Sequence, residues 1–267
     1  MNVSRWAVFF SAAMFVLLTA GSAEVSQTAL RCAAPHEMTR FTVRLPNTAR
    51  AIRSGKELVI LAIGSSSTEG VGASDGAHAY PALLAEELRR RWPQLSVTVI
   101  NKGIGGELAS QMLARFERDV LPYHPQLVIW QTGSNQALRS GDIKEYSGTI
   151  REGISRLKAA RVDIVLMDPQ FAPRVLARPI HLLIVDSIGA VANDMKVAVF
   201  RRFAVMRHWI SSGQYKVEDI ISSDGLHMND VSYSCIARLL ADSVIAATER
   251  ETNDRRPSEV ARDASSR

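Results

Sequence analysis

The chain has 267 residues, 46% of them hydrophobic, which is enough to bury one substantial core, and we expect a single α/β domain. Its formal charge of +5 is mild for this length. The basic residues are spread along the chain without the interleaved aromatic residues of a base-stacking surface, so nucleic acid is not an expected partner.

The first 23 residues have the pattern of a secretory signal peptide. Arg5 precedes an uncharged run over residues 6–20, and small side chains follow up to Ala23. An uncleaved membrane anchor is the alternative, but the run is shorter than the ~20 apolar residues that a spanning helix needs. We therefore expect export to the periplasm or the medium, with cleavage after Ala23 and no stable membrane insertion afterwards.

Two cysteines remain after this leader, Cys32 near the mature start and Cys235 near the end. An oxidising compartment would permit them to form a disulfide. Two unpaired thiols are the alternative, and both remain open because the sequence does not give the distance between the two residues.

The rest of the chain divides into three parts. Residues 24–56 are expected to form a loop-like N-terminal extension, and residues 249–267, which are charged, polar and without period, a disordered tail. Over residues 57–248, short apolar runs alternate with longer segments of helical period, which predicts a parallel sheet flanked by helices. The five candidate strands are residues 57–63, 96–101, 127–132, 162–167 and 196–200.

Between the candidate strands, apolar residues recur at about every fourth position, which predicts helices that pack on the sheet. One region, residues 171–194, could form a helix or a long loop on the substrate side. The helical stripes lie over residues 80–88, 108–120, 146–157 and 233–244.

The first candidate strand runs directly into Gly64-Ser65-Ser66, a turn whose small residues let the backbone approach a ligand and present a hydroxyl. In an open parallel sheet, the loops that leave the carboxyl ends of the strands surround the ligand crevice. A serine-rich helix cap is the alternative. A phosphate loop is disfavoured because no Gly-Lys-Ser/Thr follows, and Thr68 stands where a Gly-x-Ser-x-Gly elbow has its second glycine.

The second and third strands also end in loops that can supply hydrogen-bond donors. Residues 101–107 include Gly106, whose backbone N–H is exposed in such a loop, and Asn135 follows the third strand with a side-chain amide. Donors of this kind stabilise a negatively charged oxygen. Taken singly, a loop glycine and a turn asparagine are the alternatives.

Asp224 and His227 stand three residues apart, just before the last helical segment. This spacing can place the carboxylate against one imidazole nitrogen and leave the other nitrogen free to accept a proton. A helix cap is the alternative role for Asp224. A metal site is not expected, because no other histidine lies nearby at ligand spacing and Cys235 would lie along the helix.

Together the four clusters resemble the four blocks of the SGNH hydrolase superfamily, also called the GDSL lipases and esterases. The resemblance covers residues 57–244, which is most of the mature chain. The matching segments, in block order, are Gly64-Ser65-Ser66, Gly106, Gly133-Ser134-Asn135 and Asp224-Gly225-Leu226-His227.

This resemblance implies a three-layer α/β/α sandwich with a central, mostly parallel five-stranded sheet. It also implies a serine ester hydrolase in which Ser66 is the nucleophile and His227 and Asp224 complete a catalytic triad. The oxyanion hole would consist of the Ser66 and Gly106 backbone N–H groups and the Asn135 amide. No metal or organic cofactor is expected.

The sequence departs from the family pattern at a few positions. Ser65 stands where the name-giving motif has aspartate, and Gln136 and Met228 stand where aspartate and proline are common. Gly105 rather than Gly106 would be the donor if the second block is aligned one residue off. None of these departures removes a group that the chemistry needs.

The residues beside these groups are candidate substrate contacts. Four of them are Ser65, Glu69, Gln131 and Trp130. Trp130 could also line a pocket, and packing within the domain is the alternative. The same two roles are open for Tyr80, His78 and Phe171.

The substrate follows less directly, because SGNH enzymes cleave acetyl groups from polysaccharides, short-chain esters, lysophospholipids and thioesters. Export favours an ester of a carbohydrate or of the envelope, and the lack of a long apolar insertion favours a short acyl group. The alternatives are an acyltransferase to a glycan acceptor, a lysophospholipase or thioesterase, and a non-catalytic glycan-binding module. The oligomeric state is left open.

Overall fold

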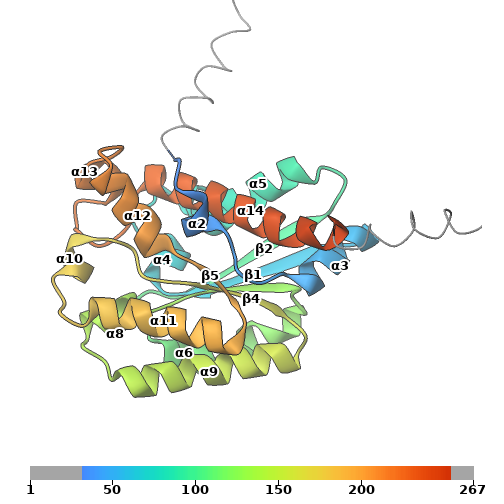
Figure 1. The fold of residues 1–267 in the computed structure, drawn as a ribbon, viewed down its shortest axis with the longest axis horizontal. Coiled ribbons are helices and arrows are strands. Elements are labelled where there is room, and N and C mark those ends of the chain that lie inside the picture. Colours follow the sequence, from blue (N-terminus) through green and yellow to red (C-terminus); the bar gives the residue numbers. More distant parts are fainter. Residues whose placement is uncertain (1–31, 254–267) are drawn as a thin grey trace, which may run out of the picture. The chain divides into compact units, whose positions relative to one another are not determined.

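The computed structural model describes residues 32–253. The chain divides after Ala33 into two units, and every element named below belongs to the second unit. Its centre is a parallel sheet with the strand order β2-β1-β3-β4-β5 (Figure 1). All five predicted strands are therefore confirmed. They are β1 (Leu58–Gly64), β2 (Val97–Gly103), β3 (Leu127–Gln131), β4 (Asp163–Met167) and β5 (Ala198–Phe200).

The register aligns the carboxyl ends of neighbouring strands. Gly64, the last residue of β1, pairs with Gly103, the last residue of β2, and Ile63 pairs with Trp130 of β3. The loops that leave these strands therefore open at one edge of the sheet, which we call the carboxyl edge. The opposite edge, where the strands begin, is the amino edge.

Helices cover both faces of the sheet, which confirms the three-layer α/β/α sandwich (Figure 1). The layers bury the strands on both sides, and this explains their near-continuous apolar sequences. One layer consists of α3 (Pro46–Ser54), α5 (Tyr80–Arg91) and α14 (Asp230–Asn253). The other consists of α6 (Ala109–Ala114), α9 (Ile143–Ala159) and α11 (His181–Met195).

Shorter elements connect these layers to the strands. Two of them, α4 (Ser66–Glu69) and α8 (Ser134–Leu138), begin directly after β1 and β3 at the carboxyl edge. The others are α2 (His36–Thr39), η1 (Gly76–His78), α7 (Phe116–Asp119), η2 (Leu121–Tyr123), α10 (Pro173–Leu176), α12 (Arg202–Ser211) and α13 (Val217–Ile220).

The expected loop-like stretch before β1 instead contains α2 and α3, so that part of the prediction is wrong. Pro46 opens α3, where its missing N–H costs nothing, and Gly55 ends the helix with a left-handed φ of 64°. Asp163, at the start of β4, accepts hydrogen bonds from the Thr48 backbone N–H (2.8 Å) and the Asn47 side chain (3.0 Å). This contact between distant segments gives α3 a fixed place against the sheet.

The region that the sequence left open, residues 171–194, is mainly helical. It forms α10 and most of α11, and α11 buries Ile184, Ile188 and Val191. The last helix, α14, continues to Asn253, past the predicted start of the tail at residue 249. The predicted signal peptide and the tail beyond residue 253 lie outside the described residues.

The two cysteines, Cys32 and Cys235, are disulfide-bonded and buried, so the alternative of free thiols does not hold. Cys235 lies on α14, a helix long and apolar enough to cross a membrane by length and composition alone. However, 61% of its apolar stretch is buried within the fold, where α14 packs against α5. This packing is typical of the core helix of a globular domain.

Candidate active site

The turn after β1 presents Ser66 at the carboxyl edge. Ser65 is extended and caps α4, and Ser66 is the first residue of that helix. A side chain at Gly64 would clash, because its Cβ would lie 2.1 Å from Thr68 Oγ1 and 2.6 Å from Gln131 Oε1. Glycine therefore lets the chain turn sharply enough to place the half-buried Ser66 hydroxyl beside the loop before α14.

Ser66, His227 and Asp224 form a continuous hydrogen-bonded chain. His227 Nε2 lies 2.8 Å from Ser66 Oγ, and His227 Nδ1 contacts the Asp224 carboxylate. A backbone hydrogen bond from the Ser222 N–H to the His227 carbonyl (2.8 Å) holds the turn that carries both residues. Gly72 packs against this turn so closely that its Cβ would lie 2.9 Å from His227 Cβ.

The Asp224 carboxylate is anchored by its own loop. Its Oδ1 accepts the backbone N–H groups of Leu226 (2.9 Å) and His227 (3.0 Å), while Oδ2 faces the imidazole. Partial burial acts to raise the pKa of Asp224, but these N–H donors and the imidazole outweigh it and hold the pKa below its usual value. Asp224 therefore stays negatively charged across the neutral range.

The loop after β2 approaches the same hydroxyl. A Cβ at Gly103 would lie 2.0 Å from the Glu69 backbone nitrogen, and one at Gly105 would lie 3.9 Å from Ser66 Cβ. Gly106 follows with a left-handed φ of 78°, and its carbonyl accepts a hydrogen bond from Arg139 (2.8 Å). Only glycines permit this close approach of the second loop to the first.

Asn135 links the third loop to the second. It lies in the first turn of α8, and one N–H of its amide donates to the Glu107 carbonyl at 2.9 Å. An amide nitrogen carries two N–H groups, so the second remains to bind a ligand. The structure thus gathers the four predicted blocks at the carboxyl edge.

Burial contradicts three of the predicted substrate contacts. Ser65, Gln131 and Trp130 are at most 3% exposed. Gln131 Oε1 accepts the Ser65 N–H (2.9 Å), and the Trp130 indole N–H points to Met112 Sδ (3.3 Å). These side chains support the site from below, whereas Glu69 is exposed beside the glycine loop and remains a candidate contact.

The other residues proposed to line a pocket have packing or pairing contacts in the structure. Tyr80 is fully buried against Thr68, and burial raises the pKa of its hydroxyl to about 12. His78 is exposed and paired with Asp75 at 2.8 Å. Phe171 packs edge-on against Phe203. Packing is therefore the role that the structure gives Tyr80 and Phe171.

One buried residue of the site, Gln170, was not predicted from the sequence. It follows β4 at the carboxyl edge and is 1% exposed, and its amide contacts Ser134 and the Leu226 carbonyl. The available signal was its position, because it stands after the fourth strand as the other polar clusters stand after the first three.

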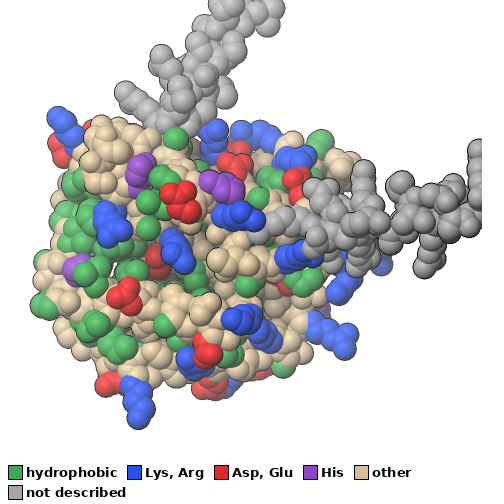
Figure 2. Space-filling view, viewed as in Figure 1, with side chains coloured by type: hydrophobic (Ala, Val, Ile, Leu, Met, Phe, Trp, Pro, Cys, Tyr) green, Lys and Arg blue, Asp and Glu red, His purple; other side chains and the backbone are tan. Residues whose placement is uncertain are grey.

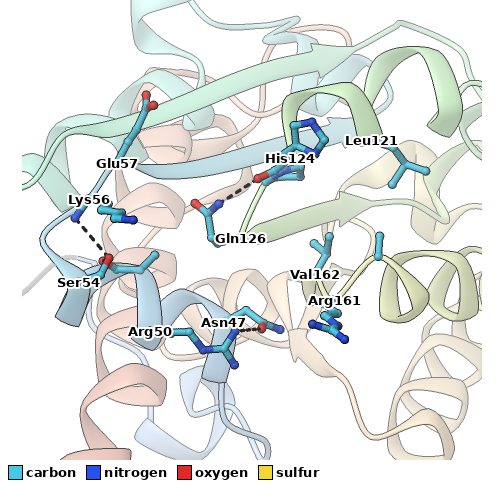
Figure 3. Close-up of a pocket in the computed structure, with 13 residues that line it drawn as sticks. Asn47, Arg50, Ser54, Lys56, Glu57, Leu121, His124, Gln126, Arg161 and Val162 are labelled. Atoms are coloured by element: carbon cyan, nitrogen blue, oxygen red, sulfur yellow. Dashed lines mark hydrogen bonds between the residues drawn. The ribbon is translucent and has the colours of Figure 1, made fainter.

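A groove of about 690 Å³ lies at the amino edge, away from these groups (Figure 3). It is bordered by α3 and by the loops that precede β1, β3 and β4. Its charged and imidazole-bearing side chains are Arg50, Lys56, Glu57, His124 and Arg161. The hydroxyl of Ser54, the serine in its lining, donates to the Ala51 carbonyl (2.7 Å) and accepts the Lys56 N–H (3.4 Å).

Residues 31–250 match the family described as the non-GDSL lipase-like family. The acetylxylan esterase of Geobacillus stearothermophilus is 31% identical over 135 residues, which cover 44% of this chain and 61% of that enzyme. The Escherichia coli (strain K12) thioesterase 1/protease 1/lysophospholipase L1 is 32% identical over 108 residues, covering 40% of this chain and 49% of that one. The matches thus span about half to three fifths of these relatives.

A solved structure shares the fold at low sequence identity. A two-domain esterase active on acetylated mannans, co-crystallised with mannopentaose, has a TM-score of 0.63 and 21% identity to this chain. The alignment covers 79% of this chain and 56% of the esterase. At this identity the likeness concerns the fold alone.

Proposed function

The chain belongs to the non-GDSL lipase-like family, within the SGNH hydrolase superfamily, and on that premise we propose that it is an exported serine esterase. Its substrates are carboxylic esters with short acyl groups, acetyl in particular, on carbohydrate. The observation that carries the proposal is the 2.8 Å contact between Ser66 Oγ and His227 Nε2, with Asp224 on the other imidazole nitrogen.

The reaction begins with acylation of Ser66. His227 Nε2 accepts the hydroxyl proton while Ser66 Oγ forms a bond to the ester carbonyl carbon. His227 then gives this proton to the leaving alkoxide, the carbon–oxygen bond of the ester breaks, and the alcohol departs. Ser66 now carries the acyl group.

Water completes the cycle in the reverse order. A water molecule gives a proton to His227 Nε2 and attacks the acyl carbon, and the tetrahedral intermediate collapses to the carboxylic acid. The Ser66 oxygen recovers its proton from His227. Asp224 holds the imidazole with its Nδ1–H toward the carboxylate, so Nε2 is the nitrogen that accepts protons in both steps.

Negative charge develops on the carbonyl oxygen in both steps, and the donors around Ser66 stabilise it. They are the Ser66 and Gly106 backbone N–H groups and the free N–H of the Asn135 amide. One such donor contributes about 3 kcal/mol to lowering the barrier.

Two observations support acetylated carbohydrate as the substrate. A relative in the sequence comparison is named an acetylxylan esterase, and an esterase with the same fold acts on acetylated mannans. The N-terminal sequence pattern supports export, which would bring the enzyme to extracellular or envelope glycans.

A second candidate is hydrolysis of thioesters or lysophospholipids. It is favoured by the similarity to the E. coli protein whose name includes thioesterase and lysophospholipase. The same acyl-enzyme chemistry serves these substrates, so the acyl and leaving groups have to be compared directly.

The proposal is tested with p-nitrophenyl acetate and butyrate, acetylated xylan, an acyl-thioester and a lysophospholipid, each with and without an acceptor sugar. We expect the wild type to release acetate from the first and third substrates, and Ser66→Ala to lose at least about 10⁴-fold in kcat. Ser155→Ala removes an exposed hydroxyl on α9 and serves as the matched control. Unchanged hydrolysis by Ser66→Ala would refute the assignment, and an acetylated acceptor sugar instead of free acetate would identify an acyltransferase.

A further inference from the structure

Gln170 lies beneath the candidate site and contacts segments from several parts of the chain. Its Oε1 accepts hydrogen bonds from Ser134 Oγ at 2.7 Å and Arg202 Nη2 at 3.0 Å, and Ser67 Oγ approaches it at 3.4 Å. Its Nε2 donates to the Leu226 carbonyl at 3.0 Å. Because the side chain is 1% exposed, these protein groups take the place of water around it.

The network itself fixes the orientation of the Gln170 amide. Arginine has only N–H donors, so the Gln170 atom that faces Arg202 must be the oxygen. The nitrogen must then face Leu226, whose carbonyl can only accept. Arg202 is itself held by a hydrogen bond from its Nε to the Asp168 carbonyl (3.0 Å), so the amide has a rigid support.

Three of the residues that bind Gln170 are next in sequence to a group of the proposed mechanism. Ser67 follows the nucleophile and Ser134 precedes the oxyanion donor Asn135. Leu226 precedes the general base His227. These three segments come from distant parts of the sequence and meet at this one side chain.

We propose that Gln170 is a positioning residue that holds the nucleophile, the oxyanion amide and the imidazole in register through these neighbours. The inference rests on the proposed function. Catalysis by such a constellation depends on the alignment of groups from separate loops, and displacements of about 1 Å in a loop can reduce the rate by up to about a hundredfold. The link from Gln170 Nε2 to Leu226 fixes the imidazole relative to the other two groups.

Gln170→Glu tests this link while it preserves the rest of the network. A glutamate keeps an oxygen acceptor for Ser134 and Arg202, and the neighbouring Arg202 favours its ionised form. It replaces the donor to the Leu226 carbonyl with an oxygen that repels it. We expect kcat for p-nitrophenyl acetate at pH 8 to fall about tenfold to hundredfold, with KM within about twofold.

Gln126→Glu is the matched control. Gln126 lies at the amino edge, where its Oε1 accepts the Val59 N–H (2.8 Å) and its Nε2 donates to the His124 carbonyl (2.9 Å). The substitution therefore removes the same kind of amide-to-carbonyl bond at a distance from the site. We expect kcat for this variant to equal that of the wild type.

A second readout separates positioning from general stability. The rate at which a fluorophosphonate labels Ser66 should fall in parallel with kcat in Gln170→Glu, measured at a temperature where circular dichroism shows the variant to be folded. A normal kcat and labelling rate in a folded Gln170→Glu would overturn the inference. If Ser66→Ala is inactive in the same assay, the proposed function survives that result.

Ser134→Ala keeps the inference testable if Gln170→Glu does not fold. It removes the 2.7 Å donor to Gln170 and leaves the amide bound to Arg202 and Leu226. We expect a severalfold fall in kcat with an unchanged KM. The rate of fluorophosphonate labelling should fall by the same factor as kcat. A kcat equal to that of the wild type would contradict the positioning role.

Discussion

At the carboxyl edge of the sheet, short loops bring the Ser66 hydroxyl and the His227 imidazole into contact and place Asn135 on a neighbouring loop. At the amino edge, α3 and the loops before the strands surround a groove of about 690 Å³ with basic side chains. Figure 2 shows part of this difference, because Lys and Arg gather on the right, where Figure 1 places α3, and hydrophobic side chains gather on the left, near α8 and α10. Convergence of reactive groups, rather than cavity volume, therefore identifies the candidate site.

The two ends of β4 carry buried carboxyl groups with different surroundings. Asp163, at the amino edge, accepts three hydrogen bonds from Asn47 and Thr48. Burial raises its pKa, and these donors oppose the rise. Asp168, at the carboxyl edge, accepts the Phe203 N–H (2.8 Å), and burial raises its pKa to about 7 despite that donor and the nearby Arg202.

This difference extends to other buried groups. Gln131 Nε2 and Arg202 Nη1, both at the carboxyl edge, lack a hydrogen-bond partner within the described part of the chain. Buried polar atoms are rarely left unsatisfied. The amino edge uses its buried polar groups to attach α3, whereas at the carboxyl edge Gln131 binds the Ser65 N–H and Arg202 binds Gln170.

The largest expected effect is that of Asp224→Asn on catalysis. The side-chain oxygen of the new asparagine would accept the two backbone N–H groups that Asp224 Oδ1 now accepts. The NH₂ group of the asparagine would then face His227 Nδ1. That arrangement selects the tautomer whose Nε2 carries the proton and cannot accept one from Ser66. We expect kcat for p-nitrophenyl acetate to fall about 10⁴-fold.

Asp142→Asn is its control, because Asp142 also accepts a backbone N–H, that of Glu145 at 2.7 Å, but caps α9. It should leave kcat unchanged. Equal activity of Asp224→Asn and the wild type would show that the carboxylate does not orient the imidazole.

Asn135→Ala should have the next largest effect. It removes a side-chain donor at the carboxyl edge, and we expect kcat to fall about 10²-fold to 10³-fold with little change in KM. Asn47→Ala removes an equivalent amide at the amino edge, where it binds Asp163 (3.0 Å), and should lower the melting temperature without changing kcat. If both variants lose kcat to the same degree, the two edges do not differ in the way proposed.

Much of the fold could be predicted from the sequence because burial on both faces leaves a direct pattern. The apolar run Leu58–Gly64 and the stripe of Tyr80, Leu84 and Leu88 each appear as expected. Helix α3 escaped prediction because its place depends on Thr48 and Asn47 meeting Asp163, more than a hundred residues later. Local sequence does not contain such a contact.

The reactive groups of the site could also be predicted, because Ser66, Asn135 and the Asp224–His227 pair each belong to a recognisable sequence block. The buried residues that support them could not be predicted. Gln131 and Trp130 stand at the end of β3, shortly before Asn135, yet helices pack on both faces of the sheet and bury them. Gln170 acquires its importance only when three distant loops meet.

Asp168 gives a smaller effect, on stability rather than on rate. A carboxyl whose pKa rises from an ordinary value near 4 to about 7 makes the folded chain bind more protons than the unfolded chain between these pH values. The free energy of unfolding therefore falls as pH rises through this window, and the stabilisation is fully present only below about pH 4.

Comparison of wild type with Asp168→Asn isolates this contribution. The free energy of unfolding, measured in urea at pH 5 and pH 8, should decline more in the wild type, by roughly 1–3 kcal/mol. Other titrating groups are shared and cancel in the difference. Parallel pH dependences would show that Asp168 does not titrate in this window.

The smallest effect is expected at the amino-edge groove. Lys56→Ala with Arg161→Ala removes two exposed cations from its border, and neither belongs to the proposed mechanism. Exposed substitutions of this kind usually change stability by less than about 0.5 kcal/mol. We expect kcat/KM for p-nitrophenyl acetate to stay within twofold of the wild type. A tenfold loss would mean that the groove takes part in turnover, and reactive-group convergence alone would no longer distinguish the two edges.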